Sequence, residues 1–129
     1  MKRPVEGCTC GSGRPYEACC GRYHAGEPPA DAETLMRARY SAYVRGLEAY
    51  LRASWHAATR PPTLDLDSTP RPQWIGLTVV SHAPLDATHA TVEFVARYKL
   101  NGRAFRLHET SRFERVNGNW LYVDGEIRE

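Results

Sequence analysis

The sequence predicts an α+β protein in which N-terminal helices pack on an antiparallel sheet formed by the second half, with a small cysteine-rich module in front. Three observations lead to this prediction. All four cysteines of the 129 residues lie between positions 8 and 20. Apolar residues then recur at steps of three and four, which is the period of a helix. From residue 74 onward the period becomes two, and two Asn-Gly pairs mark tight turns between strands.

Length and composition fit one ordinary domain with a small appendage. The chain is 42% hydrophobic and 25% charged, with a formal net charge of +2. No stretch approaches the ~20 apolar residues of a transmembrane helix, and residues 1–7 hold no apolar run typical of a secretory signal. We therefore expect a cytoplasmic protein with no membrane partner. So small a net charge does not favour nucleic acid as a partner.

The cysteine cluster predicts one structural zinc ion. Four thiolates suit tetrahedral zinc, and four protein ligands leave no open position for a substrate. The glycines and serine at 11–13 can turn backbone N–H groups toward the sulfurs. Positive charge is supplied nearby by Lys2, Arg3, Arg14 and Arg22.

Two other uses of the cysteines are less favoured. Structural disulfides need an oxidising compartment, and a bond between Cys19 and Cys20 would be strained. A redox or iron–sulfur site is disfavoured because neither the C-x-x-C spacing nor the usual ferredoxin spacings are present. We do not expect His24 to be a ligand, since four cysteines already fill a tetrahedral site.

The segment CTCGSGRPYEACC, residues 8–20, resembles the SEC-C motif, a zinc module found at the C-terminus of the SecA translocation ATPase. By this resemblance the zinc ligands are Cys8, Cys10, Cys19 and Cys20, with Cys20 standing where SecA has histidine. SecA's similar module is implicated in contacting its chaperone partner and the ribosome. The resemblance therefore implies a protein or ribosomal partner for this chain.

A helical region is expected after a Gly- and Pro-containing linker at residues 21–30. Asp31 can cap a helix over residues 32–45, and Gly46 separates it from a second helix over 47–55. The apolar stripe consists of Met36, Tyr40, Tyr43, Val44, Leu47, Leu51 and Trp55. We accordingly divide the chain into a zinc module, residues 1–25, and a main domain, residues 26–129.

Strands are expected over residues 74–81, 88–100, 103–115 and 119–127, after a loop at 63–72. The two-residue turns Asn101-Gly102 and Asn117-Gly118 fix the register of the last three strands. One face then carries Val92, Phe94, Ala96, Tyr98, Phe105, Leu107, Phe113 and Tyr122. The helices are expected to pack on this apolar face.

Three polar residues, Glu109, Ser111 and Asp124, project from the same face, with Asp124 expected opposite Ser111. Carboxylates on a core face are costly unless they are satisfied. Either they line a pocket and act as acid/base or hydrogen-bonding groups, with His56 and Tyr122 as accessory groups, or they form a structural network. In that network Arg37, Arg39 or Ser111 would satisfy the carboxylates.

The opposite face carries a possible anion- or RNA-binding strip, with Arg97 directly across from Arg106. The strip would consist of Arg97, Lys99, Arg103, Arg106 and Arg112. Glu93 and Glu114 are interspersed, however, and the aromatic side chains of a base-stacking platform are missing. A charge-mixed, solvated face is therefore expected, with nucleic acid an unlikely partner.

Helices followed by a curved antiparallel meander is the order of the cystatin-like cone fold of nuclear transport factor 2 and ketosteroid isomerase. The segments LMRARYSAYV (35–44), Trp55-His56, HETSRF (108–113) and WLYVDG (120–125) resemble the bacterial YchJ family, which joins a SEC-C module to such a cone. Members of that family are largely uncharacterised, so the resemblance implies the fold but no reaction.

Two functions follow as hypotheses. The first is a zinc-bearing adaptor or binding protein without enzymatic activity. The second is a small-molecule-binding protein or enzyme, because cone-fold enzymes such as ketosteroid isomerase use carboxylates in an apolar pocket. Fold analogy alone does not establish chemistry. The subunit count stays open, although cone-fold sheets often dimerise through their exposed faces.

Overall fold

A computed structural model describes residues 7–64, 66 and 70–128. The 3₁₀ helix η1 (Tyr16–Ala18) and α1 (Cys20–His24) come first, followed by α2 (Ala32–Arg45) and α3 (Glu48–Ala53). The strands are β1 (Gln73–Pro84), β2 (His89–Leu100), β3 (Arg103–Val116) and β4 (Asn119–Ile127). They form one antiparallel sheet in the order β1-β2-β3-β4. The α+β prediction is confirmed.

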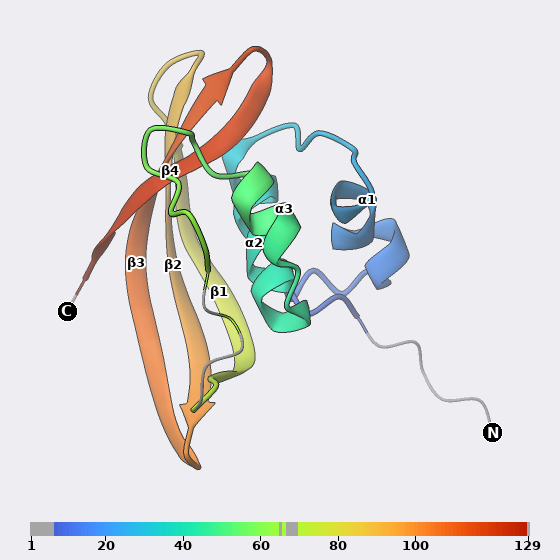
Figure 1. Ribbon diagram of the computed structural model, residues 1–129, viewed down its shortest axis with the longest axis vertical. Coiled ribbons are helices and arrows are strands. Elements are labelled where there is room, and N and C mark those ends of the chain that lie inside the picture. Colours follow the sequence, from blue (N-terminus) through green and yellow to red (C-terminus); the bar gives the residue numbers. More distant parts are fainter. Residues whose placement is uncertain (1–6, 65, 67–69, 129) are drawn as a thin grey trace.

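Helices α2 and α3 lie between the sheet and the N-terminal segment that carries α1 (Figure 1). None of the helices in the described ranges is long and apolar enough to cross a membrane. Lys2 and Arg3, expected near the cysteines, lie outside the described residues, as does part of the loop at 63–72.

Helix α2 begins and ends where the sequence predicts. The Asp31 side chain accepts a hydrogen bond of 2.8 Å from the Thr34 backbone N–H, which satisfies one of the free donors of the first turn. Gly46 ends the helix with φ 71°, a left-handed conformation that glycine adopts without strain. The chain then turns directly into α3.

The hairpin between β2 and β3 has the predicted register. Asn101 and Gly102 both have positive φ, 52° and 78°, as a two-residue type I′ turn requires. Phe94 consequently lies opposite Glu109, and Val92 opposite Ser111. The inner face of β2 is buried from Ala90 through Ala96 in alternation with outward residues.

The register of β3 and β4 corrects one prediction. Phe113 pairs with Tyr122 as expected, but the register shifts between Arg112 and Phe113, so that Arg112 pairs with Asp124 and Ser111 with Gly125. A β-bulge of this kind adds one residue to one strand, and a one-residue slip moves every later side chain to the other face. The prediction that Asp124 faces the core is therefore wrong.

The core has two adjoining parts that share α2. The first lies between α2 and the sheet and consists of Ala32, Leu35, Met36, Tyr40, Ala90, Val92, Phe94, Ala96, Phe113 and Trp120. The second lies on the other side of α2, where Ala38 packs with Tyr23 and the four cysteines. Because the N-terminal segment packs on α2, the proposed division at residue 25 separates two parts that are in direct contact.

Candidate functional site

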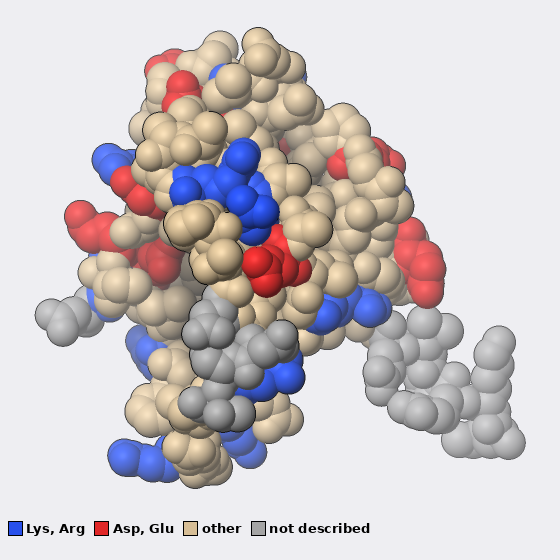
Figure 2. All heavy atoms as spheres, in the orientation of Figure 1, with Lys and Arg blue, Asp and Glu red and all other residues tan. Residues whose placement is uncertain are grey.

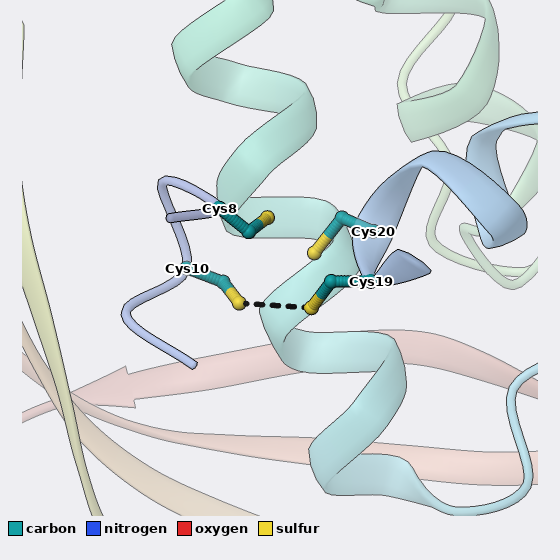
Figure 3. Close-up of side chains that lie close together, drawn as sticks. All are labelled: Cys8, Cys10, Cys19 and Cys20. Atoms are coloured by element: carbon teal, nitrogen blue, oxygen red, sulfur yellow. Dashed lines mark hydrogen bonds between the residues drawn. The ribbon is translucent and has the colours of Figure 1, made fainter. Parts of the chain in front are cut away.

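The four cysteine side chains converge on one point beside α2. Cys8 and Cys10 come from the loop before η1, and Cys19 and Cys20 from the start of α1 (Figure 3). Their sulfur atoms all lie within 4.8 Å of one another, and all four thiols are free and buried. Tetrahedral zinc–thiolate bonds of about 2.3 Å separate the sulfurs by about 3.8 Å. The donor set therefore fits a four-coordinate metal ion.

The loop that carries Cys8 and Cys10 is closed by backbone hydrogen bonds. The Cys8 N–H donates to the Arg14 carbonyl at 2.7 Å, and the Gly11 N–H donates to the Cys8 carbonyl at 3.0 Å. Gly11 and Gly13 have φ values of 87° and 83°, which residues with a side chain rarely adopt. These glycines let the loop turn tightly enough to bring both sulfurs to the same side.

Polar groups around the cluster stabilise negative charge on sulfur. The Ser12 hydroxyl lies 3.1 Å from the Cys19 sulfur, and an Arg14 Nη2 donates to the same sulfur at 3.8 Å. A hydrogen bond from the Cys20 thiol lowers the pKa of Cys10 to about 4, and the same interaction raises the pKa of Cys20. This interaction favours the thiolate form of Cys10, which is the form in which cysteine binds a metal ion.

The module is fastened to α2 by side-chain hydrogen bonds. Arg37 Nη1 donates to the Cys10 carbonyl at 2.9 Å and its Nε donates to Glu33 at 3.1 Å, so this arginine is engaged by the module and by α2. His24 Nε2 lies 2.8 Å from the Ala38 carbonyl and must donate to it, so Nδ1 accepts from the Tyr16 hydroxyl at 2.6 Å. Burial lowers the pKa of His24, which favours this neutral form. Both nitrogens of the ring are engaged away from the sulfurs.

A cavity of about 280 Å³ lies between α2 and the inner face of the sheet. Its apolar wall is formed by Met36, Trp74, Phe94, Ala96, Leu107 and Phe113. Its polar lining residues include Arg39, Tyr43, Glu109, Ser111 and Tyr122. Burial raises the pKa of both tyrosines, so they remain neutral phenols.

Glu109 is held in the cavity wall by two neighbours. The buried Ser111 hydroxyl donates to Glu109 Oε2 at 2.7 Å. The carboxyl group also lies directly against Gly125, where an added Cβ would come within 2.5 Å of Glu109 Cδ. The bulge in β4 therefore matters to the cavity, because it places Gly125, which has no side chain, beside this carboxylate.

Arg39 is the most deeply buried charge of the cavity, with 5% of its surface exposed. Its Nη1 donates to the Leu51 carbonyl at 2.8 Å and to Ser54 Oγ at 2.7 Å. The guanidinium carbon lies 4.9 Å from the centre of the Trp55 ring and 4.5 Å from that of Tyr122. Burial lowers the pKa of Arg39.

Among the residues proposed from sequence, Glu109, Ser111 and Tyr122 meet in the cavity, whereas Asp124 and His56 do not. Asp124 lies on the outer face in an ion pair with Arg112. His56 Nε2 lies 3.2 Å from Glu114 Oε1, outside the cavity lining.

The cavity also contains residues that sequence reasoning did not assign to it, chiefly Arg39, Tyr43 and Trp74. From sequence, Arg39 is predicted only as a possible partner for the carboxylates. It follows Met36 by three positions and precedes Tyr43 by four, so the helical period that predicted the apolar stripe could have placed it on the same wall.

The outer charges are mixed in sign. On the face drawn in Figure 2, groups of Lys and Arg atoms lie next to groups of Asp and Glu atoms, except at the β2–β3 end of the sheet, where only basic groups are seen. Within the strip predicted from sequence, Arg112 pairs with Asp124 and Arg97 donates to Thr78. Interspersed Glu93 accepts a hydrogen bond of 2.6 Å from His108.

Fold and site together define a cone-fold protein with an N-terminal four-cysteine module suited to a metal ion. The profile described as "YchJ, middle NTF2-like domain" matches residues 31–125, and that of the SEC-C motif matches residues 6–22. The chain belongs to the YchJ-like family, as its sequence segments predicted.

Relatives and solved structures agree with this assignment. A UPF0225 protein of Cupriavidus metallidurans is 60% identical over 129 residues, covering 95% of this chain and 89% of the relative. One of Ralstonia nicotianae is 53% identical over 135 residues, covering 96% and 93%. The solution structure of a SEC-C motif containing protein from Rhodopseudomonas palustris, 30% identical, superposes with a TM-score of 0.85 and covers 96% of this chain and 100% of that one. A crystal structure of a SEC-C motif containing protein from Psychrobacter arcticus, also 30% identical, gives 0.78, with coverages of 97% and 84%.

Proposed function

We propose that this protein binds a small amphipathic molecule in the cone cavity and carries one structural zinc ion in its N-terminal module. The observation that carries the first part is the cavity itself. Protein interiors are normally filled to crystal density, yet about 280 Å³ stays open between α2 and the sheet, with polar groups among apolar walls. Such pockets are the usual form of small-molecule sites.

Zinc is the metal that the donor set favours. Soft thiolate ligands select zinc over hard cations such as magnesium and calcium. With all four positions taken by protein sulfur, the ion would stabilise the fold and activate no water. Four free thiols also suit a reducing compartment, which supports a location in the cytoplasm.

Native mass spectrometry of protein purified under mild conditions tests both parts. We expect one zinc ion per chain and a retained small molecule. Ala96→Phe, which fills the cavity, should remove the small molecule and keep the zinc. Ala104→Phe, at an exposed position of β3, is the matched control and should retain both.

Two results would contradict the proposal. If the purified chain carries no small molecule, and no compound in a metabolite panel raises its melting temperature, the pocket function is contradicted. Oxidised cysteines without metal would argue against zinc.

A protein or ribosomal partner is the second candidate, favoured by exposed arginines on the metal module and on α2 beside it. The Arg22 guanidinium lies 5.1 Å from the centre of the Tyr23 ring, and that of Arg45 lies 3.5 Å from the Tyr16 ring. Exposed cations held on aromatic rings suit an acidic surface. Cosedimentation with ribosomes should be lost in an Arg22→Glu/Arg45→Glu variant that keeps its zinc. If the unaltered chain does not cosediment with ribosomes, or if the variant cosediments as well as the unaltered chain does, the arginine-mediated contact is excluded.

A further inference from the structure

The cavity contains two opposite charges that do not neutralise each other by contact. Arg39 and Glu109 both line it, yet the ion pairs of the described residues include none between them. The pairs instead involve surface and module residues. Each of the two charges is therefore available to something that enters the cavity.

Arg39 retains donor capacity. A guanidinium group has five N–H donors; among the described residues, Nη1 of Arg39 donates to the neutral oxygens of Leu51 and Ser54, and the side chain also interacts with the neutral Tyr43 hydroxyl. The guanidinium is 5% exposed, and the partners that touch it among the described residues, these neutral oxygens and the rings of Trp55 and Tyr122, carry no negative charge. An anionic group in the cavity would supply the missing charge.

Glu109 retains acceptor capacity on the same wall. A carboxylate can accept about four hydrogen bonds, and Glu109 accepts one from Ser111. Contact with Gly125 on the other side holds the group in place. A cationic or hydrogen-bond-donating group in the cavity would use the remaining capacity.

The rest of the lining sets the size and character of the occupant. Its apolar wall includes Trp74, Phe94, Leu107 and Phe113, which suit a hydrocarbon or aromatic body. A volume of about 280 Å³ limits the occupant to a small molecule.

We infer that the occupant is a small zwitterion of the α-amino acid type with an aromatic or branched apolar side chain. Its carboxylate pairs with Arg39, its ammonium group with Glu109, and its side chain packs on the aromatic wall. A simple acid would be repelled by Glu109, a simple amine by Arg39, and a neutral molecule would leave both charges uncompensated. This inference rests on the proposed small-molecule function.

Titration calorimetry on the full, zinc-loaded chain tests the inference with four probes that share a phenylethyl body. They are L-phenylalanine, which is zwitterionic, 3-phenylpropanoate, 2-phenylethylamine and the neutral 2-phenylethanol. We expect L-phenylalanine to bind best, and each single-charge analogue at least tenfold more weakly, a difference of about 1.4 kcal/mol.

Variants separate the two charges. Glu109→Gln keeps the shape of the side chain. It should weaken the binding of L-phenylalanine at least tenfold, whereas 3-phenylpropanoate should bind with equal or higher affinity. Arg39→Met should weaken the binding of L-phenylalanine and leave the affinity for 2-phenylethylamine unchanged. If Arg39→Met does not fold, Glu109→Gln still decides the question. Glu126→Gln, exposed on β4, is the matched control and should bind as the unaltered chain does.

The inference is overturned, and the pocket function kept, if 3-phenylpropanoate or 2-phenylethanol binds as well as L-phenylalanine, or if Glu109→Gln changes nothing. It is also overturned if none of the probes binds while native mass spectrometry still finds a retained molecule of another class. If neither experiment finds an occupant, the inference and the proposed function both fail.

Discussion

Replacing Gly125 with alanine should destabilise the protein through Glu109. An added methyl group would lie 2.5 Å from Glu109 Cδ and 3.0 Å from Cγ, so the carboxylate must move. Moving it breaks the 2.7 Å hydrogen bond from buried Ser111. Leaving a buried hydroxyl without its partner costs about 1–3 kcal/mol, and overpacking costs a similar amount. Because both effects arise from one displacement, we expect a total of about 2–3 kcal/mol.

Urea unfolding followed by circular dichroism measures this loss, which corresponds to a fall in Tm of about 4 °C per kcal/mol. Glu126→Ala, exposed on the same strand, is the control and should change stability little. In a double-mutant cycle, Glu109→Ala should remove the clash, so that the double variant is about 1–2 kcal/mol more stable than additivity predicts. A harmless Gly125→Ala would refute this reasoning, because it would mean that contact with Gly125 does not hold the Glu109 carboxylate against Ser111.

Three further predictions concern the metal site, the core and the outer face. Cys10→Ser should abolish zinc binding, measured by elemental analysis. It should also lower the Tm of the whole chain, because Ala38 of α2 packs against the cysteine cluster. Full metal content in this variant would contradict the four-cysteine site. Phe113→Ala should cost about 3–5 kcal/mol in urea unfolding, since the ring is 2% exposed, and a loss below about 1 kcal/mol would contradict its core position. Arg112 holds the pKa of Asp124 below its ordinary value, so the pair stabilises the fold above the unfolded pKa of about 3.9 and loses this effect as pH falls through the lower, folded pKa. Asp124→Asn should therefore flatten the acid limb of a Tm-against-pH curve, and superimposable curves would show that the pair contributes nothing.

The elements that could be predicted are those whose ends carry a local chemical signal. Helix α2 has a capping aspartate before it and a glycine after it, and both bounds were predicted. The two Asn-Gly turns likewise fixed the start of each hairpin, because positive φ at both positions selects a two-residue loop.

The bulges could not be predicted, because no residue type requires them. Shifts in register lie between Trp74 and Gly76 and between Val79 and Ser81 in β1, which is also longer at both ends than the predicted strand. The shift at Arg112 had the largest effect, since it exchanged Asp124 for Gly125 at the cavity wall. Alternation of apolar and polar residues counts positions but does not reveal an inserted one.

The residues that form the metal site and the cavity could largely be predicted, but the way in which these elements pack together could not. The spacing of the cysteines predicted that the four thiols meet, and the alternation of side chains along β3 predicted that Glu109 lies beside Ser111. The packing of the module on α2 depends on small residues such as Ala38 and Ser41, which carry no pattern of their own. His56 lies near β3, the strand that carries Glu109, but its ring faces Glu114 instead. Tertiary contacts alone determine this orientation.

Neighbouring residues of α2 serve different sites. Ala38 packs with the cysteines and Ser41 lies 3.4 Å from the Cys8 sulfur, whereas Arg39 and Tyr40 line the cavity. An occupant of the cavity that shifts α2 would therefore displace the residues that contact the cysteines. Loss of the metal would in turn allow the α2 residues that line the cavity to move. Thermodynamic linkage makes such a coupling symmetric: the factor by which zinc alters the affinity for the occupant is the factor by which the occupant alters the affinity for zinc. For a chain that binds zinc and an occupant as proposed, we therefore expect the affinity of the pocket to depend on the zinc content of the preparation.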